Sequence, residues 1–506
     1  MSSHDSRRIT EIGAEVATAC GVVHGRTLLH DDMGQPAAAV SAWLGIPYAA
    51  PPVGPLRWKP PQPHAGWAGV LDVSNFGPDM VQAPNARLRG NGQGEDVLTL
   101  SVWAPQGAAA GSLPVMVWLH GGGFVGGGAS DIRSDGAALA RLGVVVVAIN
   151  YRTGVFGWMA HPELSRESPD GVSGNWGLMD QLLALHWIRG QISGFGGDAS
   201  RVTLFGVSAG SASISLLLTA PAAAGLFHRA ILHSPGAGRP LATLDEAEAA
   251  GGDLGSLDAL RALDAAGVAA LASKLNPAVR GLTTPRVLRP ICDGVLLPGQ
   301  ERQALLAGRL HAMPIIVGSN TDEGSLLTAS WPVRTVADWQ ALVQRNFGLA
   351  ASQALAHYPV AGDADVRAAV AALFGDTQFN AGVRLLARAM AVRGAPVWRY
   401  LFTRRRPGQQ DGPHHGDEVA HAFGNLRASY GDAIDATDRA LSVSMMRAWV
   451  GFARDAEPNA GGELSWPRFD VASDPHRELG DAAASASHWR ASTLDFLDAY
   501  YASQGL

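Results

Sequence analysis

Short apolar runs that alternate with helical repeats dominate the hydrophobic pattern of the chain. Residues 113–119 and 144–150 are almost continuously apolar, as expected of parallel strands that are covered on both faces. Leucines at helical spacing follow Asn175 and indicate a helix. Further strands are predicted at residues 96–103, 202–207, 231–233, 313–317 and 397–402. This alternation predicts an α/β protein with a large, mostly parallel central sheet flanked by helices.

Two stretches interrupt the alternation. Residues from about 240 to 280 are rich in alanine, and residues 336–393 have a helical pattern, so we predict a helical insertion at each. No internal repeat or low-complexity linker divides the chain, which indicates a single domain over residues 1–506. The polar segment 1–20 is predicted to be poorly ordered.

Composition and charge restrict the function. Apolar residues make up 47% of the chain and charged residues 17%, which favours a large buried core. The net charge of −6 and the lack of a long basic run argue against a nucleic-acid partner. No apolar run has membrane-spanning length, and the first residues do not resemble a signal peptide, so no membrane insertion is predicted. With only Cys20 and Cys292, a reducing cytoplasmic location is expected.

The run 202–207 leads into the motif Gly206-Val-Ser208-Ala-Gly210. In G-x-S-x-G, a sharp turn from strand to helix crowds the neighbouring backbone, and the two glycines relieve that crowding. The serine hydroxyl is then exposed above the sheet, beside a helix N-terminus that favours negative charge. The motif indicates a nucleophile, although a chain with 61 glycines also contains such patterns by chance.

Three glycines follow the apolar run 113–119, in His120-Gly-Gly-Gly-Phe124. Such a segment brings backbone N–H groups close to a ligand, as an oxyanion hole requires, and Gly122 and Gly123 are the predicted donors. A flexible turn or a phosphate loop is the alternative. No Gly-Lys-Ser/Thr follows, and no dinucleotide-binding glycine pattern with a distal acid is present.

Acids and histidines for a catalytic triad occur later in the chain, in adjacent pairs. Asp322 and Glu323 follow the run 313–317, where an acid at a strand end is placed to orient an imidazole or simply caps the next helix. His414 and His415 lie in a glycine-bounded loop. Zinc-binding spacings are absent, so a general base is favoured over a metal site. The residues alone do not choose within either pair.

From about residue 21 onward, the chain resembles the type-B carboxylesterase and cholinesterase-like family of α/β-hydrolases. The resemblance rests on the order and spacing of short segments rather than on any one of them. These segments are residues 45–49, 51–58, 95–96, 121–124, 150–152, 174–181, 195–198, 205–210, 322–324, 415–418 and 466–468.

The resemblance implies ester hydrolysis without a metal or an organic cofactor, acting on a small-molecule ester. It assigns Ser208 as the nucleophile, His415 as the general base and Glu323 as the orienting acid. It also implies an oxyanion hole formed by the backbone N–H groups of Gly122, Gly123 and Ala209, and it suggests that Ser234 supports Glu323.

The same triad serves other acyl chemistry, so a lipase or an amide or carbamate hydrolase is the alternative. A non-catalytic interaction protein of the same family is a further one, disfavoured because Ser208, Glu323 and His415 are all present. The sequence does not distinguish a monomer from a homodimer.

Two departures from the family pattern bear on stability and specificity. Met80 and Val97 stand where relatives often have a cysteine pair, so an apolar contact is expected to replace the bridge. Val207 stands where relatives commonly carry a glutamate. The site therefore lacks a carboxylate that would favour cationic esters, and neutral esters are predicted.

Four side chains are candidates for the substrate pocket: Val207, Phe124, Trp331 and Phe379. The spacing of Trp331 and Phe379 is equally typical of ordinary helix packing, which we prefer for both.

Overall fold

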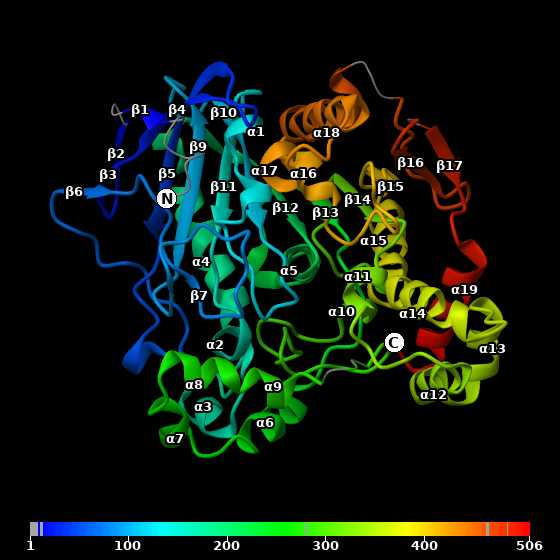
Figure 1. Ribbon diagram of the computed structural model, residues 1–506. Coiled ribbons are helices and arrows are strands. Elements are labelled where there is room, and N and C mark those ends of the chain that lie inside the picture. The colour runs from blue at the N-terminus through cyan, green and yellow to red at the C-terminus, as the bar shows by residue number, and fades with distance from the viewer. Residues whose placement is uncertain (1–8, 11–13, 278, 280, 462–464, 483) are drawn as a thin grey trace.

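A twelve-stranded sheet runs through the molecule, with helices on both faces (Figure 1). The computed structural model describes residues 9–10, 14–277, 279, 281–461, 465–482 and 484–506. In spatial order the strands are β1 (Ile9–Thr10), β4 (Arg26–His30), β5 (Pro36–Pro47), β9 (Thr99–Pro105), β11 (Val145–Ile149), β10 (Leu113–Leu119), β12 (Gly197–Val207), β13 (Arg229–His233), β14 (Ile315–Asn320), β15 (Val397–Phe402), β16 (Pro475–Leu479) and β17 (Ala484–Ser487).

The centre of this sheet is parallel, and its two ends are antiparallel. Each neighbouring pair from β11 to β16 runs parallel, whereas β1, β4, β5 and β9 on one side and β17 on the other pair antiparallel. The predicted strands at 113–119 and 397–402 match β10 and β15, and the strand predicted at 96–103 is β9, which begins at Thr99. Two small sheets consist of β2 (Glu15–Thr18), β3 (Gly21–His24) and β6 (Val70–Asp72), and of β7 (Asp79–Met80) and β8 (Gln93–Gly94).

Alternate residues of the central strands enter two hydrophobic clusters, one on each face of the sheet. On one face Val115 and Val117 of β10 share a cluster with α4 (Trp176–Gln191) and α5 (Ala209–Leu217). On the other face Trp118 shares a cluster with α18 (Ala436–Asp455). Burying each such side chain stabilises the fold by about 1.5–3 kcal/mol. The near-continuous apolar pattern of the strands follows from burial on both faces.

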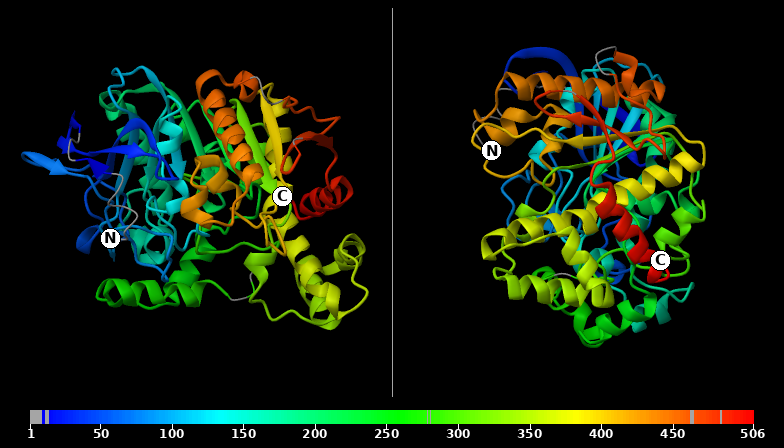
Figure 2. Two further views of the ribbon diagram at one scale, coloured as in Figure 1. Left: turned by 45° about the horizontal axis from the view of Figure 1, so that its top comes forward. Right: turned by 90° about the vertical axis from the view of Figure 1, so that its right-hand side faces the viewer.

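The first predicted insertion lies away from α18, at the other end of the molecule in both views of Figure 2. The first contains α6 (Leu244–Gly252), α7 (Leu257–Arg261), α8 (Ala265–Ala270) and α9 (Ala272–Leu275). The second contains α12 (Val336–Phe347), α13 (Ala351–His357), α14 (Val366–Gly375), a π-helical turn (Asp376–Asn380) and α15 (Ala381–Val392).

The second insertion divides into two parts. Helices α12 to α14 share a separate cluster with α19 (Ala491–Ser503), whereas α15 packs on β14 and β15 and belongs to the cluster of α4 and α5. The second predicted insertion, which ends at residue 393, therefore includes a helix that packs directly on the central sheet. The reason is that α15 has the same apolar periodicity as its neighbours, and periodicity does not reveal which surface a helix covers.

The prediction of a poorly ordered segment over residues 1–20 does not hold for residues 15–18, because these form β2 and pair with β3. Residues 1–8 and 11–13 of that segment lie outside the described part. Met80 and Val97, the expected substitutes for a cysteine pair, are both buried in the same cluster. Cys20 and Cys292 are free thiols.

The remaining helices are short, and none of the helices in the described residues is long and apolar enough to cross a bilayer. They are α1 (Ala137–Ala140), α2 (Gly154–Trp158), α3 (Pro162–Glu167), α10 (Glu301–Leu306), α11 (Ser325–Thr328), α16 (Glu418–Phe423) and α17 (Leu426–Tyr430).

Candidate active site

Ser208 occupies the turn between β12 and α5 with φ 57° and ψ −120°, a conformation that is strained for a residue with a side chain. The turn packs against the end of β10. A Cβ on Gly206 would lie 2.8 Å from the carbonyl oxygen of Leu119, and a Cβ on Gly210 would lie 2.0 Å from the same atom. Both glycines are therefore required by close packing, as the motif predicts, and Ser208 lines the cavity above the sheet.

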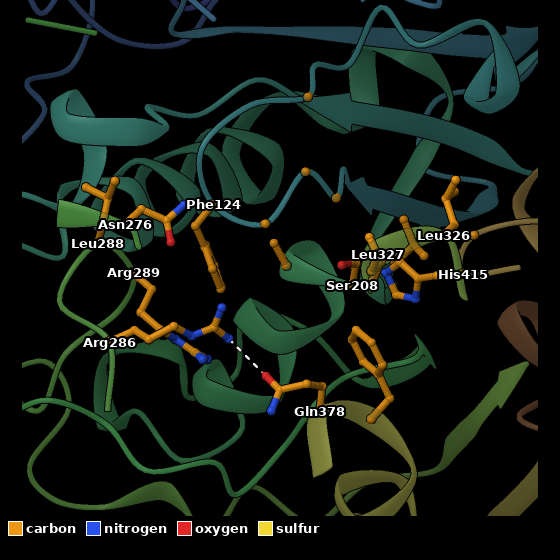
Figure 3. A pocket seen from close by; sticks show the side chains of 18 of the residues that line it. Phe124, Ser208, Asn276, Arg286, Leu288, Arg289, Leu326, Leu327, Gln378 and His415 are labelled. Carbon is orange, nitrogen blue, oxygen red and sulfur yellow. Dashed lines mark hydrogen bonds between the residues drawn. The ribbon is translucent and has the colours of Figure 1, made fainter. Parts of the chain in front are cut away.

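A histidine and a glutamate from neighbouring strand ends face each other beside Ser208. The Nδ1–H of His415, which follows β15, donates to Oε2 of Glu323, which follows β14, across 2.5 Å. Glu323 is buried, and its Oε1 accepts hydrogen bonds from Ser234 Oγ at 2.6 Å and from the Asn320 backbone N–H at 2.7 Å. The other imidazole nitrogen, Nε2, has no hydrogen-bond partner among the described residues, and Figure 3 shows Ser208 beside this ring.

The neighbours of these two residues have other partners. Asp322 accepts hydrogen bonds from the backbone N–H of Ser325 at the start of α11 and from that of Gly412, so it links the start of this helix to the loop before His414. His414 Nδ1 lies 3.2 Å from the side-chain nitrogen of Gln409. Of the two adjacent acids and the two adjacent histidines, Glu323 and His415 are thus the ones that contact each other beside Ser208. Within the described residues, no group of three or more His, Cys, Asp or Glu side chains is placed to hold a metal ion.

The glycine loop and the start of α5 present backbone N–H groups to the cavity. Gly122, with φ 132°, and Gly123, with φ 64°, line the cavity together with Ala209. No described residue accepts a hydrogen bond from the N–H of Gly122 or Gly123. Ala209 is the first residue of α5, where the N–H groups lack partners within the helix and the helix dipole favours negative charge. Preceding the loop, His120 is buried, which lowers its pKa to about 4 and makes it a poor base candidate.

Three of the four pocket candidates line the cavity, which has a volume of about 300 Å³. They are Val207, Phe124 and Phe379. Phe379 stacks on the imidazole of His415 with ring centroids 4.4 Å apart and planes 23° apart. Trp331 does not line the cavity. It packs edge-on against Phe374, which is a lining residue, with centroids 5.6 Å apart, as ordinary helix packing predicts.

Phe379 reaches His415 because it lies in the π-helical turn Asp376–Asn380, which the sequence pattern did not predict. A π-helical turn inserts one residue into a helix and rotates the side chains that follow it. Here the turn places Phe379 against the histidine and the preceding residue, Gln378, in the wall of the same cavity. No sequence signal marks such a turn, because its hydrophobic pattern is continuous with α14 and α15.

Arginines are the second feature that the sequence analysis missed. Only one carboxylate, Asp131, is among the described lining residues, and it is paired with Arg133 at 2.9 Å and Arg87 at 3.7 Å. The lining contains five arginines: Arg87, Arg133, Arg239, Arg286 and Arg289. They are scattered over 200 positions of a chain whose net charge is negative, so no local motif indicates them.

A buried polar cluster supports the loop that carries His415. Asn320 Nδ2 donates to Glu418 Oε2 and to the carbonyl oxygen of His414, both at 2.6 Å. Trp449 Nε1, which can only donate, contacts His233 Nε2 at 3.2 Å, so the proton of His233 is on Nδ1, which lies 3.5 Å from Glu418. Burial raises the pKa of Glu418, but the nearby His233 and the hydrogen bond from Asn320 outweigh this effect and lower the pKa, which keeps the group ionised.

The comparisons with known proteins agree with this architecture. The chain matches the "Carboxylesterase family" over residues 13–497. It is 46% identical to a "Fumonisin B1 esterase" of Sphingopyxis macrogoltabida over 85% of this chain and 82% of that protein. It is also 33% identical to a "Para-nitrobenzyl esterase" of Bacillus subtilis (strain 168), over 85% of this chain and 89% of the relative.

Among solved structures, a PNB esterase superposes with a TM-score of 0.83 at 31% identity, covering 96% of this chain and 99% of that one. The predicted α/β-hydrolase fold is therefore confirmed, with its large mixed sheet flanked by helices. The chain belongs to the carboxylesterase family.

Proposed function

We propose that this carboxylic ester hydrolase acts through an acyl-enzyme formed on Ser208, with His415 as general base and Glu323 as the orienting acid. The observation that carries the proposal is the 2.5 Å hydrogen bond from His415 Nδ1 to Glu323, which leaves Nε2 without a partner in the described structure and beside the serine. A base held in one tautomer by a buried acid is the arrangement that activates a serine hydroxyl.

In the first step, Nε2 of His415 takes the proton of Ser208 Oγ while Oγ attacks the ester carbonyl carbon. The carbonyl oxygen becomes an oxyanion, which the N–H groups of Gly122, Gly123 and Ala209 stabilise. His415 then donates the proton to the departing alkoxide. In the second step, His415 deprotonates a water molecule that attacks the acyl-enzyme, and the carboxylic acid leaves as Ser208 regains its proton.

Esters are preferred over amides and carbamates as substrates in this proposal, because the relatives named above are esterases. Val207 in the cavity wall supports the expectation that cationic esters are disfavoured, since no carboxylate precedes the nucleophile. The five arginines of the lining alter the expectation of neutral substrates, because they favour substrates that carry negative charge. A cytoplasmic location is also proposed, supported by the two free thiols and testable by cell fractionation.

The test is the Ser208→Ala variant. We expect its turnover of p-nitrophenyl butyrate to fall by about 10⁶-fold, because the covalent step requires Oγ. The exposed Ser330 gives a matched control, and Ser330→Ala is expected to retain the activity of the unaltered protein. An organophosphonate probe should label Ser208 and no other serine, as located by peptide mass spectrometry. Undiminished turnover by Ser208→Ala would overturn the assignment.

A further inference from the structure

Arg286 and Arg289 lie at one end of the cavity, away from His415 (Figure 3), and a third lining arginine, Arg239, contacts Gln378 at the same end. Arg239 lies between β13 and α6, and Arg286 and Arg289 lie between α9 and α10. Arg239 Nη1 donates to Gln378 Oε1 at 2.8 Å, and Arg286 Nη2 donates to the same oxygen at 3.1 Å. The three side chains therefore come from two segments that are far apart in sequence, and the Gln378 amide joins one side chain of each segment, Arg239 and Arg286.

The orientation of Gln378 is set from its other side. Its Nε2 donates to the carbonyl oxygen of Leu282 at 2.9 Å, so Oε1 faces the two arginines. An amide oxygen accepts hydrogen bonds and carries no net charge. Gln378 thus positions Arg239 and Arg286 without neutralising them, whereas a glutamate at this place would form ion pairs with both.

The convergence of like charges is electrostatically unfavourable. Burial, together with the positive charges of Arg289 and Arg286, lowers the pKa of Arg239. The buried Glu301 offsets part of this charge from behind the wall, where its oxygens accept hydrogen bonds from Ser215 Oγ at 2.5 Å and from the Gly238 backbone N–H at 2.7 Å. Glu301 does not line the cavity, so the charged side chains that a substrate meets at this end are the guanidinium groups.

The arginine end and the catalytic end share the ring of Phe124 as a wall. The guanidinium carbon of Arg289 lies 5.5 Å from the centroid of this ring. Phe124 directly follows Gly122 and Gly123, the proposed oxyanion donors. A substrate that reaches past Phe124 from Ser208 therefore meets positive charge, and a cavity with low-dielectric walls strengthens that field.

We propose that the preferred substrates are esters that carry a free carboxylate elsewhere in the molecule, which Arg239, Arg286 and Arg289 bind while Ser208 attacks the ester. This inference rests on the proposed function and narrows its substrate class. Guanidinium groups suit the role because they stay charged and bind carboxylates in a bidentate manner. The carboxylate belongs to the acyl part or to the alcohol part of the ester, and the two cases are separated by experiment.

The acyl-side test compares mono-p-nitrophenyl adipate with its methyl ester, which differs only in that the distant carboxylate is masked. We expect the protein to show a kcat/KM ratio of roughly tenfold or more in favour of the carboxylate form, and Arg286→Gln to remove most of it through KM. Arg286→Lys should keep part of the preference. Because both esters are measured on one preparation, any loss of folded protein cancels in the ratio. The exposed Arg345 gives a charge-matched control, and Arg345→Gln should leave the ratio unchanged.

The alcohol-side test compares 4-butyryloxybenzoate with its methyl ester in the same set of variants. The pair whose preference depends on Arg286 identifies the part of the substrate that carries the carboxylate. If neither pair favours the carboxylate form, or if Arg286→Gln retains the preference, the inference is overturned.

A binding measurement separates failure of this inference from failure of the proposed function. Adipate dianion is titrated calorimetrically into Ser208→Ala, and we expect binding that is weakened roughly tenfold or more when Arg286→Gln is added. Equal adipate affinity in the two proteins, or no binding in either, overturns the anion site regardless of the catalytic result. Hydrolysis that persists in Ser208→Ala overturns the proposed mechanism alone.

Discussion

The two ends of the cavity are built in different ways. At the catalytic end, Ser208, Glu323 and His415 follow β12, β14 and β15, which are parallel strands of one sheet. At the other end, Arg239, Arg286 and Arg289 lie on segments between elements, and Arg239 and Arg286 are joined through Gln378. The first end depends on the order and register of the strands in the sheet, and the second depends on how the connecting segments pack.

This difference implies a division of labour between chemistry and selectivity. The carboxyl ends of parallel strands meet at one sheet edge, so residues that follow them are brought together whenever the sheet forms. Connecting segments can change their side chains without altering the core, and selectivity can therefore vary while the reaction is retained. Changes at the catalytic end should lower the turnover of all esters, whereas changes at the arginine end should alter the ratio between charged and uncharged esters.

After Ser208→Ala, the largest effect is expected for Glu323→Gln, also at the catalytic end. An amide does not stabilise the imidazolium, so kcat should fall by roughly 10⁴-fold for mono-p-nitrophenyl adipate and for its methyl ester alike. Steady-state kinetics on both esters measures this. Asp322→Asn is the matched control, because the Asp322 carboxylate accepts hydrogen bonds from the backbone N–H groups of Ser325 and Gly412. A larger loss in Asp322→Asn than in Glu323→Gln would reverse the choice of acid.

A smaller effect is expected for Ser234→Ala, which removes one hydrogen bond to Glu323 Oε1. The Asn320 N–H still holds this oxygen, so we expect kcat to fall roughly tenfold and the ratio between the two esters to stay constant. The kcat and KM values of both esters test this point. A silent variant would show that Ser234 does not support the acid, and a changed ratio would contradict the separation of the two ends.

The smallest effect is expected for Val207→Glu, which introduces a carboxylate into the cavity wall beside the nucleophile. Turnover of a cationic ester such as butyrylcholine should rise roughly fivefold relative to that of mono-p-nitrophenyl adipate, because the new charge attracts the first and repels the second. Val207→Gln controls for size. Equal shifts in the two variants would mean that shape rather than charge determines the ratio.

Much of the catalytic end could be predicted from the sequence. The strand at 113–119 was located to the residue because burial on both faces leaves a continuous apolar run, and the crowded turn around Ser208 restricts residues 206 and 210 to glycine. The choice of Glu323 over Asp322 came only from resemblance. The two acids are adjacent, and which one faces His415 depends on the turn after β14.

The errors have a common physical cause. Helix α15 was assigned to an insertion, and the preference for ordinary helix packing was wrong for Phe379, because periodicity identifies a buried face without identifying what covers it. The strand at residues 15–18 was missed because its hydrogen bonds go to β3, and its own side chains are largely exposed. In each case the error concerns which part of the molecule a segment packs against, and not the type of secondary structure that its residues favour.

Local sequence was therefore sufficient for the strands, the serine turn and the glycine loop, since these depend on backbone sterics and on burial that leaves a pattern in neighbouring residues. The arginine cluster depends on side chains from residues 239 to 378 that meet only in the folded chain, around the oxygen of Gln378. Charge acts through space, and so the property that we propose to select the substrate has no counterpart in any single stretch of the sequence.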